Sequence, residues 1–405
     1  MSGLFDTLVT ILLFIVVLGG LVLAHEFGHF VVARLARVRV LEFGIGFPPR
    51  ARSLGQGGVS AADVAQYRQR RAEAIDRAQG DPELLEAVLE TPEEPPGTLY
   101  TLNWLPIGGF CRFEDEDGGD GGASGDPRSF GRASLPVKLL ILIAGVLMNL
   151  LVAFVIFTGI AMVGEPALGV RFSEVVADSP AAAAGLQSGD TLTSINGKGY
   201  SVFDQQFPTD DLHALAGKTV VLGILHADGS TAEVTVTLRV PASANEGALG
   251  ITGLKGAQVG TIQRSVPEAV ALGAKRTVEA FSMILGGLGD LGRSIITNPT
   301  TAPPAAGPVG IAVQLGQTLQ TLGPLYVLYL AAILSANLAL VNVLPFPPLD
   351  GGRMLVLVLK ALPGGKRISI RAERLTYAVG FMVLFAFLIW VTVFDVIRQV
   401  GGGTP

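Results

Sequence analysis

The sequence predicts an α-helical polytopic membrane protein with four transmembrane helices and two β-rich segments between them. Hydrophobic residues make up 49% of the 405 residues and charged residues only 16%, below the roughly 25% that is usual for soluble domains. Four apolar runs each approach the ~20 residues that an α-helix needs to cross a bilayer. The net charge of −5 gives no reason to expect a nucleic-acid partner, and the single cysteine, Cys111, excludes an internal disulfide framework.

The four transmembrane helices are expected at residues 1–36, 139–163, 324–352 and 377–397. Their orientation follows from the flanking basic residues, because Lys and Arg gather on the cytoplasmic side of a membrane. These residues are Arg34, Arg37, Arg39, Arg50, Arg52, Arg128, Arg132, Lys138, Lys360, Lys366, Arg367, Arg371 and Arg374. Residues 37–138 and the loop 353–376 should therefore be cytoplasmic. Both termini and residues 164–323 should lie on the opposite side.

Two segments of the cytoplasmic region 37–138 have recognisable patterns. Residues 61–78 have a helix-forming composition with weak apolar periodicity, which favours a solvated helix. Residues 98–114 alternate in polarity like an amphipathic β-segment, with a turn at residues 106–109.

The first apolar helix ends in a metal-binding pattern, His25-Glu26-Phe27-Gly28-His29. Residues four apart share one helix face, so His25 and His29 can hold one metal ion while Glu26 lies beside it. Ionisable groups are expensive inside a membrane and usually have a function there. The alternative is a pair of hydrogen-bonded histidines at a helix interface.

A second polar motif, Asn342-Val-Leu-Pro-Phe-Pro-Pro-Leu-Asp-Gly-Gly352, ends the third apolar run. Its prolines cannot continue a helix, and open backbone at membrane depth is tolerated only inside protein or beside a water-filled cavity. Asp350 follows this break at the depth of the two histidines, which favours it as the third metal ligand. The alternative is a helix-ending turn with a solvated aspartate.

The external region begins with a third pattern, at residues 179–197, that is typical of a bacterial PDZ domain. We expect a short helix from the Ala-rich run, a strand at residues 190–195 and a turn at Asn196-Gly197. A hairpin of residues 220–225 and 232–240 should follow. We place this α+β domain at residues 166–256 and a juxtamembrane helical region at residues 257–323. PDZ domains bind extended peptide ends, although a small β-rich domain that binds nothing remains the alternative.

Taken together, the motifs resemble the site-2 protease family, and within it the bacterial regulator-of-sigma-E proteases. The segments Phe43-Gly-Ile-Gly-Phe47, Leu105-Pro-Ile-Gly-Gly-Phe110, Ala144-Gly-Val-Leu-Met-Asn149 and Gly307-Pro-Val-Gly-Ile311 also resemble that subgroup. The chain departs from it in three ways. It has one PDZ domain where many members have two, Val146 stands where proline is common, and the insertion at residues 53–96 is longer than usual.

The resemblance implies a zinc metalloprotease that cuts transmembrane segments of its substrates, such as anti-sigma factors or remnant signal peptides. Zinc would be bound by His25, His29 and Asp350, and Glu26 would act as general base. Asn342 would hold the substrate backbone or the developing oxyanion. Residues 98–114 would form a membrane-associated β-element, whose edge pairs with the unwound substrate. Further candidate substrate-binding residues are Gly108, Gly109, Pro345 and Pro347.

The expected location is the bacterial inner membrane, with the PDZ domain outside the cytoplasm. The expected partners are transmembrane substrates, the lipid bilayer and peptide termini or substrate domains at the PDZ domain. A non-catalytic membrane adaptor and a metal transporter with a PDZ domain are the alternatives. Glu26 argues against both, because metal binding alone does not need a base.

Overall fold

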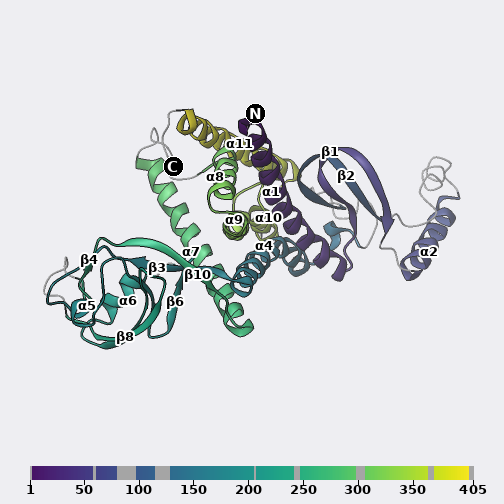
Figure 1. Cartoon of the computed structure of the whole chain (residues 1–405). Coiled ribbons are helices and arrows are strands. Elements are labelled where there is room, and N and C mark those ends of the chain that lie inside the picture. Colours follow the sequence, from purple (N-terminus) through teal and green to yellow (C-terminus); the bar gives the residue numbers. More distant parts are fainter. Residues whose placement is uncertain are drawn as a thin grey trace. The chain divides into compact units, whose positions relative to one another are not determined.

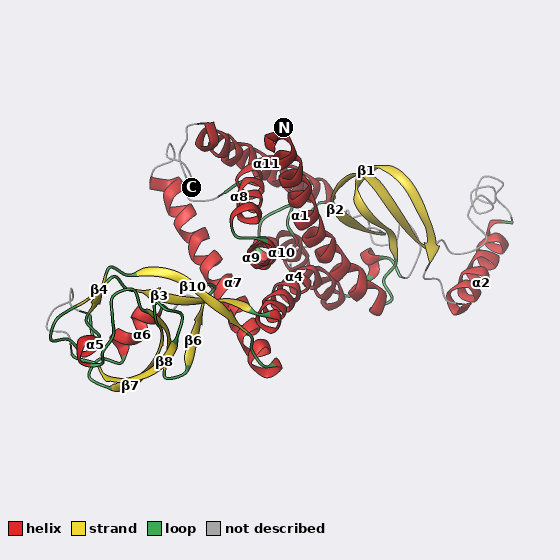
Figure 2. Cartoon of the chain, viewed as in Figure 1, coloured by secondary structure: helices red, strands yellow, loops and turns green. Residues whose placement is uncertain are grey.

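The computed structural model describes residues 2–57, 61–79, 97–114, 128–204, 207–240, 247–297, 306–363 and 369–400 (Figure 1). It separates into two compact units, which are described one at a time. Residues 1–156 and 275–405 belong to a mainly helical unit, and residues 157–274 to a second unit that is rich in β-strands (Figure 2).

Among the described residues, four helices are long and apolar enough to cross a membrane. They are α1 (Ser2–Leu35), α4 (Leu135–Val163), α9 (Pro324–Val343) and α11 (Ile370–Val400). Large apolar side chains cover the outer surfaces of these helices, and Leu4 and Phe5 on α1 are about two-thirds exposed. A surface of this kind is stable in lipid rather than in water. The chain is therefore a multi-pass membrane protein.

The predicted third segment, residues 324–352, contains the expected proline break. Helix α9 ends at Val343, where the prolines of residues 344–349 interrupt the helical backbone. A new helix, α10 (Asp350–Ala361), starts at the predicted metal ligand. The predicted loop 353–376 is thus largely helical, since α10 fills its first part and α11 begins at Ile370.

The segment between α1 and α4 contains a β-element made of β1 (Val40–Gly57) and β2 (Thr98–Phe113), with α2 (Ala61–Ala78) between them in the chain. Strand β1 was not predicted. Both strands fold back on themselves, because Gly44 of β1 pairs with Thr101 and also with Phe110 of β2. The predicted turn at residues 106–109 lies where β2 reverses, although the strand is continuous there.

Glycines let this β-element approach α1 closely. A Cβ atom on Gly108, whose φ is +82°, would lie 2.7 Å from Val22 Cγ1 of α1, and one on Gly109 would lie 2.9 Å from Leu23 Cδ1. On the helix side, a Cβ atom on Gly19 would lie 3.1 Å from the Pro106 carbonyl oxygen. The reversal of β2 is therefore held against α1, one to two turns before His25.

The predicted juxtamembrane region 257–323 contains the end of a strand and two helices, α7 (Val266–Thr297) and α8 (Pro308–Thr321). Helix α8 packs against the spans α1, α9 and α11. Its first turn is capped by the buried Asp395 of α11, which accepts hydrogen bonds from the backbone N–H groups of Gly307 and Gly310. This carboxylate satisfies helix-end donors that would otherwise be unpaired.

The second unit contains a six-stranded sheet in the order β10-β3-β6-β5-β7-β8 and a separate two-stranded sheet of β4 and β9. Its elements are β3 (Glu165–Arg171), β4 (Glu174–Val175), α5 (Pro180–Ala183), β5 (Thr191–Ile195), β6 (Lys198–Ser201), α6 (Pro208–Ala214), β7 (Thr219–Leu225), β8 (Thr231–Thr237), β9 (Ile251–Thr252) and β10 (Lys255–Ile262). Buried residues such as Phe172, Leu192 and Leu222 form its core. The short helix, the strand and the hairpin lie where they were predicted. The unit extends past residue 256, because β10 pairs with β3 as far as Ile262.

Candidate active site

Three candidate metal ligands converge on one point in the helical unit. The Nε2 atoms of His25 and His29, which lie one turn apart on α1, are 3.1 Å from each other. The Oδ2 atom of Asp350 lies 2.9 Å from His25 Nε2 and 3.3 Å from His29 Nε2. Ligands held ~2.0–2.1 Å from a tetrahedral zinc ion lie about 3.3 Å apart. The three side chains therefore fit zinc with shifts of a few tenths of an ångström.

Asp350 reaches the histidines because the chain folds tightly after α9. Gly351, the second residue of α10, is buried against backbone carbonyl groups at the end of α9 and in the proline break. A Cβ atom there would lie 2.2 Å from the Val343 oxygen and 2.3 Å from the Leu344 oxygen. Only glycine permits this approach. Gly351 therefore allows the chain to fold tightly enough for Asp350 to reach the two histidines.

The ring of His29 is fixed in the orientation that a metal requires. Its Nδ1 atom lies 2.8 Å from the carbonyl oxygen of Ile141 on α4. A carbonyl oxygen only accepts hydrogen bonds, so Nδ1 carries the proton and donates it. The lone pair of His29 is then on Nε2, the atom that faces Asp350.

Asn149 makes the corresponding contact with His25. This residue is fully buried, and its amide nitrogen lies 3.3 Å from His25 Nδ1. In this orientation its Oδ1 atom is buried with no partner among the described residues. If His25 Nε2 binds a metal, Nδ1 must carry a proton and needs an acceptor. Rotating the amide by 180° places Oδ1 beside His25 Nδ1 as that acceptor, so Asn149 can accommodate a metal-bound imidazole at His25.

The space for both imidazole rings is provided by a glycine of α4. A Cβ atom on Gly145 would lie 2.5 Å from His29 Nε2 and 2.7 Å from His25 Cε1. Within the motif itself, a Cβ atom on Gly28 would lie 2.5 Å from the carbonyl oxygen of Ala144. Helices α1 and α4 thus meet at two glycines, and any side chain at residue 145 would occupy the position of the ligands.

Glu26 is oriented by the β-element. Its Oε2 atom accepts a hydrogen bond of 3.1 Å from the backbone N–H of Cys111 on β2. This bond fixes one oxygen of the carboxylate next to the two histidines on the same helix. Because the backbone of Cys111 makes this bond, the contact could not be predicted from the type of residue at position 111.

The remaining predicted site residues lie in three different places. Asn342 lies at the metal centre, with its amide nitrogen 3.5 Å from His25 Nε2. Pro345 and Pro347 lie in the break between α9 and α10, where Pro345 is exposed and the Pro347 oxygen would be 2.1 Å from a Cβ atom on Gly380 of α11. Gly108 and Gly109 contact α1 rather than the ligand cluster.

Three groups that shape the site were not predicted from the sequence: Gly145, Asn149 and the Ile141 carbonyl. A signal was available for two of them, since a glycine and an asparagine four residues apart lie on one face of an otherwise apolar helix. The site as a whole combines three converging ligands, hydrogen bonds that fix both imidazoles and a carboxylate beside them. This combination suits hydrolysis by a metal-activated water.

Comparisons with known proteins agree with this chemistry. Three relatives that align over nearly their full lengths are each 28% identical to the chain. A putative zinc metalloprotease of Clostridium acetobutylicum aligns over 98% of both chains. The zinc metalloprotease RasP of Geobacillus kaustophilus and the regulator of sigma-W protease RasP of Bacillus subtilis each align over 96% of this chain and 98% of their own.

A solved PDZ domain of an SdrC-like protein from Listeria innocua is 30% identical over 23% of this chain and 97% of its own. Its TM-score of 0.18 is too low to establish a shared fold. The family comparison is decisive, because the model of peptidase family M50 matches residues 13–60 and 89–387, which include all the ligands and Glu26. The residues left between these segments lie within the predicted insertion at residues 53–96. By this match the chain belongs to peptidase family M50.

Proposed function

We propose that this membrane zinc metalloprotease hydrolyses peptide bonds within the transmembrane segments of its protein substrates. The observation that carries the proposal is the convergence of His25, His29 and Asp350 beside Glu26, on helices that expose apolar surfaces to lipid. A soluble substrate would not require a site on a membrane-spanning helix. A transmembrane segment reaches this depth without leaving the bilayer.

In this proposal, His25, His29 and Asp350 hold zinc, which supplies Lewis acidity toward the scissile carbonyl and toward water. Glu26 accepts a proton from the attacking water and passes it to the leaving nitrogen. Its bond to the Cys111 N–H holds one carboxylate oxygen in place for both transfers. Asn342, which lies next to His25, is suited to donate its amide N–H to the carbonyl oxygen of the substrate as negative charge develops there.

The substrate must be extended at the cleavage point, because a helix hides its peptide bonds. We propose that it pairs with β2, in the membrane-associated β-element, and passes the break that contains Pro345 and Pro347. Strand β2 contacts α1 at Gly19 and again at Glu26, so a segment lying along it would reach the general base. In this role Gly108 and Gly109 act indirectly, by letting the strand pack against α1.

We place the protein in the bacterial inner membrane, with the β-rich unit outside the cytoplasm and acting as a PDZ domain. Support comes from the basic residues on the opposite side of the spans and from the bacterial relatives. Cysteine labelling in a Cys111→Ser background tests the orientation. An impermeant reagent should reach a cysteine at Ser194 in intact cells but not one at Ser369, and the reverse pattern would invert the topology.

The PDZ domain would bind a peptide terminus or a substrate domain and so select which proteins reach the catalytic site. The regulator of sigma-W protease among the relatives makes membrane-bound anti-sigma factors reasonable candidate substrates. Remnant signal peptides are the second class.

The variant Glu26→Gln tests the proposed function. It should lose hydrolysis by at least about 10²–10⁴-fold, the usual contribution of a general base, and still bind one zinc per chain. Substrates trapped by this variant can be identified by mass spectrometry and then offered to the wild-type enzyme. Asp6→Asn, in the same helix but far from the site, is the matched control. Undiminished activity of Glu26→Gln would favour an adaptor or a metal transporter instead.

A further inference from the structure

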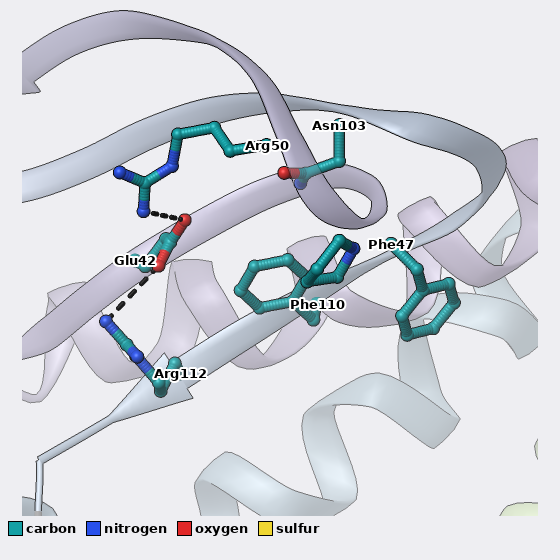
Figure 3. A pocket seen from close by; sticks show the side chains of 7 residues that line it. Glu42, Phe47, Arg50, Asn103, Phe110 and Arg112 are labelled. Carbon is teal, nitrogen blue, oxygen red and sulfur yellow. Dashed lines mark hydrogen bonds and ion pairs between the residues drawn. The ribbon is translucent and has the colours of Figure 1, made fainter.

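A second site lies in the β-element, away from the metal ligands. A cavity of about 420 Å³ opens between the arms of β1 and β2, and Figure 3 shows the side chains that line it. One end is charged and contains Glu42, Arg50 and Arg112. The other end is apolar and contains Phe47, Pro48 and Phe110.

The charged end is organised around one buried carboxylate. Glu42 is only 4% exposed, and its Oε1 atom accepts hydrogen bonds from Arg50 Nη2 and Thr101 Oγ1, each of 2.9 Å. Its Oε2 atom lies 3.2 Å from Arg112 Nη2. Two guanidinium groups thus share one carboxylate, which leaves a net charge of +1 at this end of the cavity. Each guanidinium uses one of its five N–H donors in these contacts.

Both arginines remain accessible to a ligand. The Arg50 side chain is 48% exposed and the Arg112 side chain 58% exposed, while the carboxylate between them is covered. Figure 3 shows the two guanidinium groups approaching Glu42 from opposite sides, with the ring of Phe110 beside them. Paired guanidinium groups with free N–H donors are well suited to bind a phosphate group.

The β-element is charged near Glu26 of α1 and apolar near Gly19 of α1. Its reversal contacts α1 at Gly19, while Cys111, next to Arg112, contacts Glu26. Seven residues of helix separate these two levels, a rise of about 10 Å. Exposed apolar side chains lie near the reversal of the two strands: Ile45, Phe47, Leu102, Trp104, Leu105 and Ile107. Trp104 is the most exposed of them.

We propose that the cavity binds the phosphate group of an anionic phospholipid, with Arg50 and Arg112 contacting the phosphate and Glu42 holding both guanidinium groups in place. The acyl chains would follow the apolar end of the cavity and the exposed apolar side chains deeper in the membrane. This arrangement matches a lipid, which is charged at one end and apolar along its length. A free phosphate would use only the charged end.

The test measures lipid binding by the full-length protein in a neutral detergent. Native mass spectrometry would compare phosphatidylglycerol, zwitterionic phosphatidylcholine and glycerol 3-phosphate, which has the phosphate without chains. We expect phosphatidylglycerol to bind at least tenfold more tightly than the other two. Equal binding of phosphatidylcholine, or of glycerol 3-phosphate, would overturn the proposal of a lipid headgroup site.

Arg50→Gln/Arg112→Gln should reduce phosphatidylglycerol binding to the level of phosphatidylcholine. The matched control, Arg371→Gln/Arg374→Gln, removes two exposed positive charges from the start of α11 and should leave the preference intact. An equal loss in the control would mean that general surface charge attracts the lipid, and the specific site would be wrong.

A conservative pair, Arg50→Lys/Arg112→Lys, covers the case in which the glutamine variant does not fold. It keeps both charges but not the forked donors, so binding should still weaken several-fold, and unchanged binding would contradict the proposal. Unchanged lipid binding together with a raised KM for a peptide substrate would identify the cavity as a substrate subsite instead. Because the readout is lipid binding, failure here leaves the proposed proteolysis untouched.

Discussion

The two units of the molecule differ in the polar groups that they bury and in the surfaces that they expose. In the helical unit, polar residues such as His25, Asn149 and Ser335 are buried, while large apolar side chains cover the outer surfaces of the spans. In the β-rich unit, Phe172 and Leu222 are buried, and the alternate residues of β7 and β8 face outward. The β-rich unit follows the usual rule for proteins in water. The helical unit also buries apolar side chains, but it exposes many more of them on its outer surface.

The two units are therefore stabilised differently, and only the helical unit contains the candidate catalytic residues. The β-rich unit has its own hydrophobic core, so its folding depends on apolar burial. Within a bilayer, the spans of the helical unit cannot gain from moving apolar side chains out of water, and close backbone approaches at glycine bring its helices together. The polar groups that these approaches enclose are the candidate catalytic residues. Changes in the two units should therefore have different consequences.

The largest effect on stability is expected from a core change in the β-rich unit. Leu222 is fully buried in β7, and Leu222→Ala should lower the free energy of unfolding of this unit by about 2–5 kcal/mol. Calorimetry of the full-length protein should show the loss, and zinc content should not change. The control is Val221→Ala, at the preceding residue of the strand, which is partly exposed. Loss of zinc in Leu222→Ala would show that the units are not independent.

For Gly145→Ala in the helical unit, we expect a loss of zinc affinity, which Leu222→Ala should leave unchanged. The added Cβ atom would lie 2.5 Å from His29 Nε2, and the ring cannot move away freely because Ile141 holds its other nitrogen. Zinc affinity should fall about 10–100-fold, as for other changes that misorient metal ligands. The variant Gly159→Ala, in the same helix with open space around it, should keep its zinc. Equal affinity in the two variants would remove Gly145 from the site.

The sequence predicted the ligands better than it predicted their supports. His25, His29 and Asp350 could be found because helical spacing and a proline break are local patterns. The spacing of Gly145 and Asn149 places them on one face of α4, but their contact with the histidines depends on how α4 packs against α1, which is not a local pattern. The position of Glu26 likewise depends on the backbone of a strand that is distant in sequence.

The same distinction explains the errors in the fold. Strand β1 was missed because its glycines and the Pro48-Pro49 pair resemble a loop, and only pairing with β2 makes the segment a strand. The end of the β-rich unit was placed too early because β10 pairs with β3, some ninety residues before it along the chain. The four spans were predictable, since each carries its own composition, and the prolines of the third motif predicted where the helical backbone of the third span ends.

The smallest effect concerns Asn149, which acts on the metal only through His25. Its amide lies beside His25 Nδ1 in a fully buried position, and the Ser335 hydroxyl fixes its backbone by donating to the Asn149 carbonyl oxygen at 2.7 Å. We expect Asn149→Leu, which removes the acceptor but keeps the volume, to weaken zinc binding about tenfold. Asn149→Asp keeps an acceptor facing the imidazole and should bind zinc at least as well as wild type.

Competition with a chelator, at the same pH for every variant, would measure these affinities directly. A purely structural role for Asn149 predicts a different order, because the leucine would then be tolerated and the buried aspartate would be the damaging change. The order Asp, Asn, Leu therefore identifies an acceptor for the His25 proton, and the reverse order would assign the residue to packing. Either result shows whether Asn149, a buried polar residue of the helical unit, serves metal binding or helix packing.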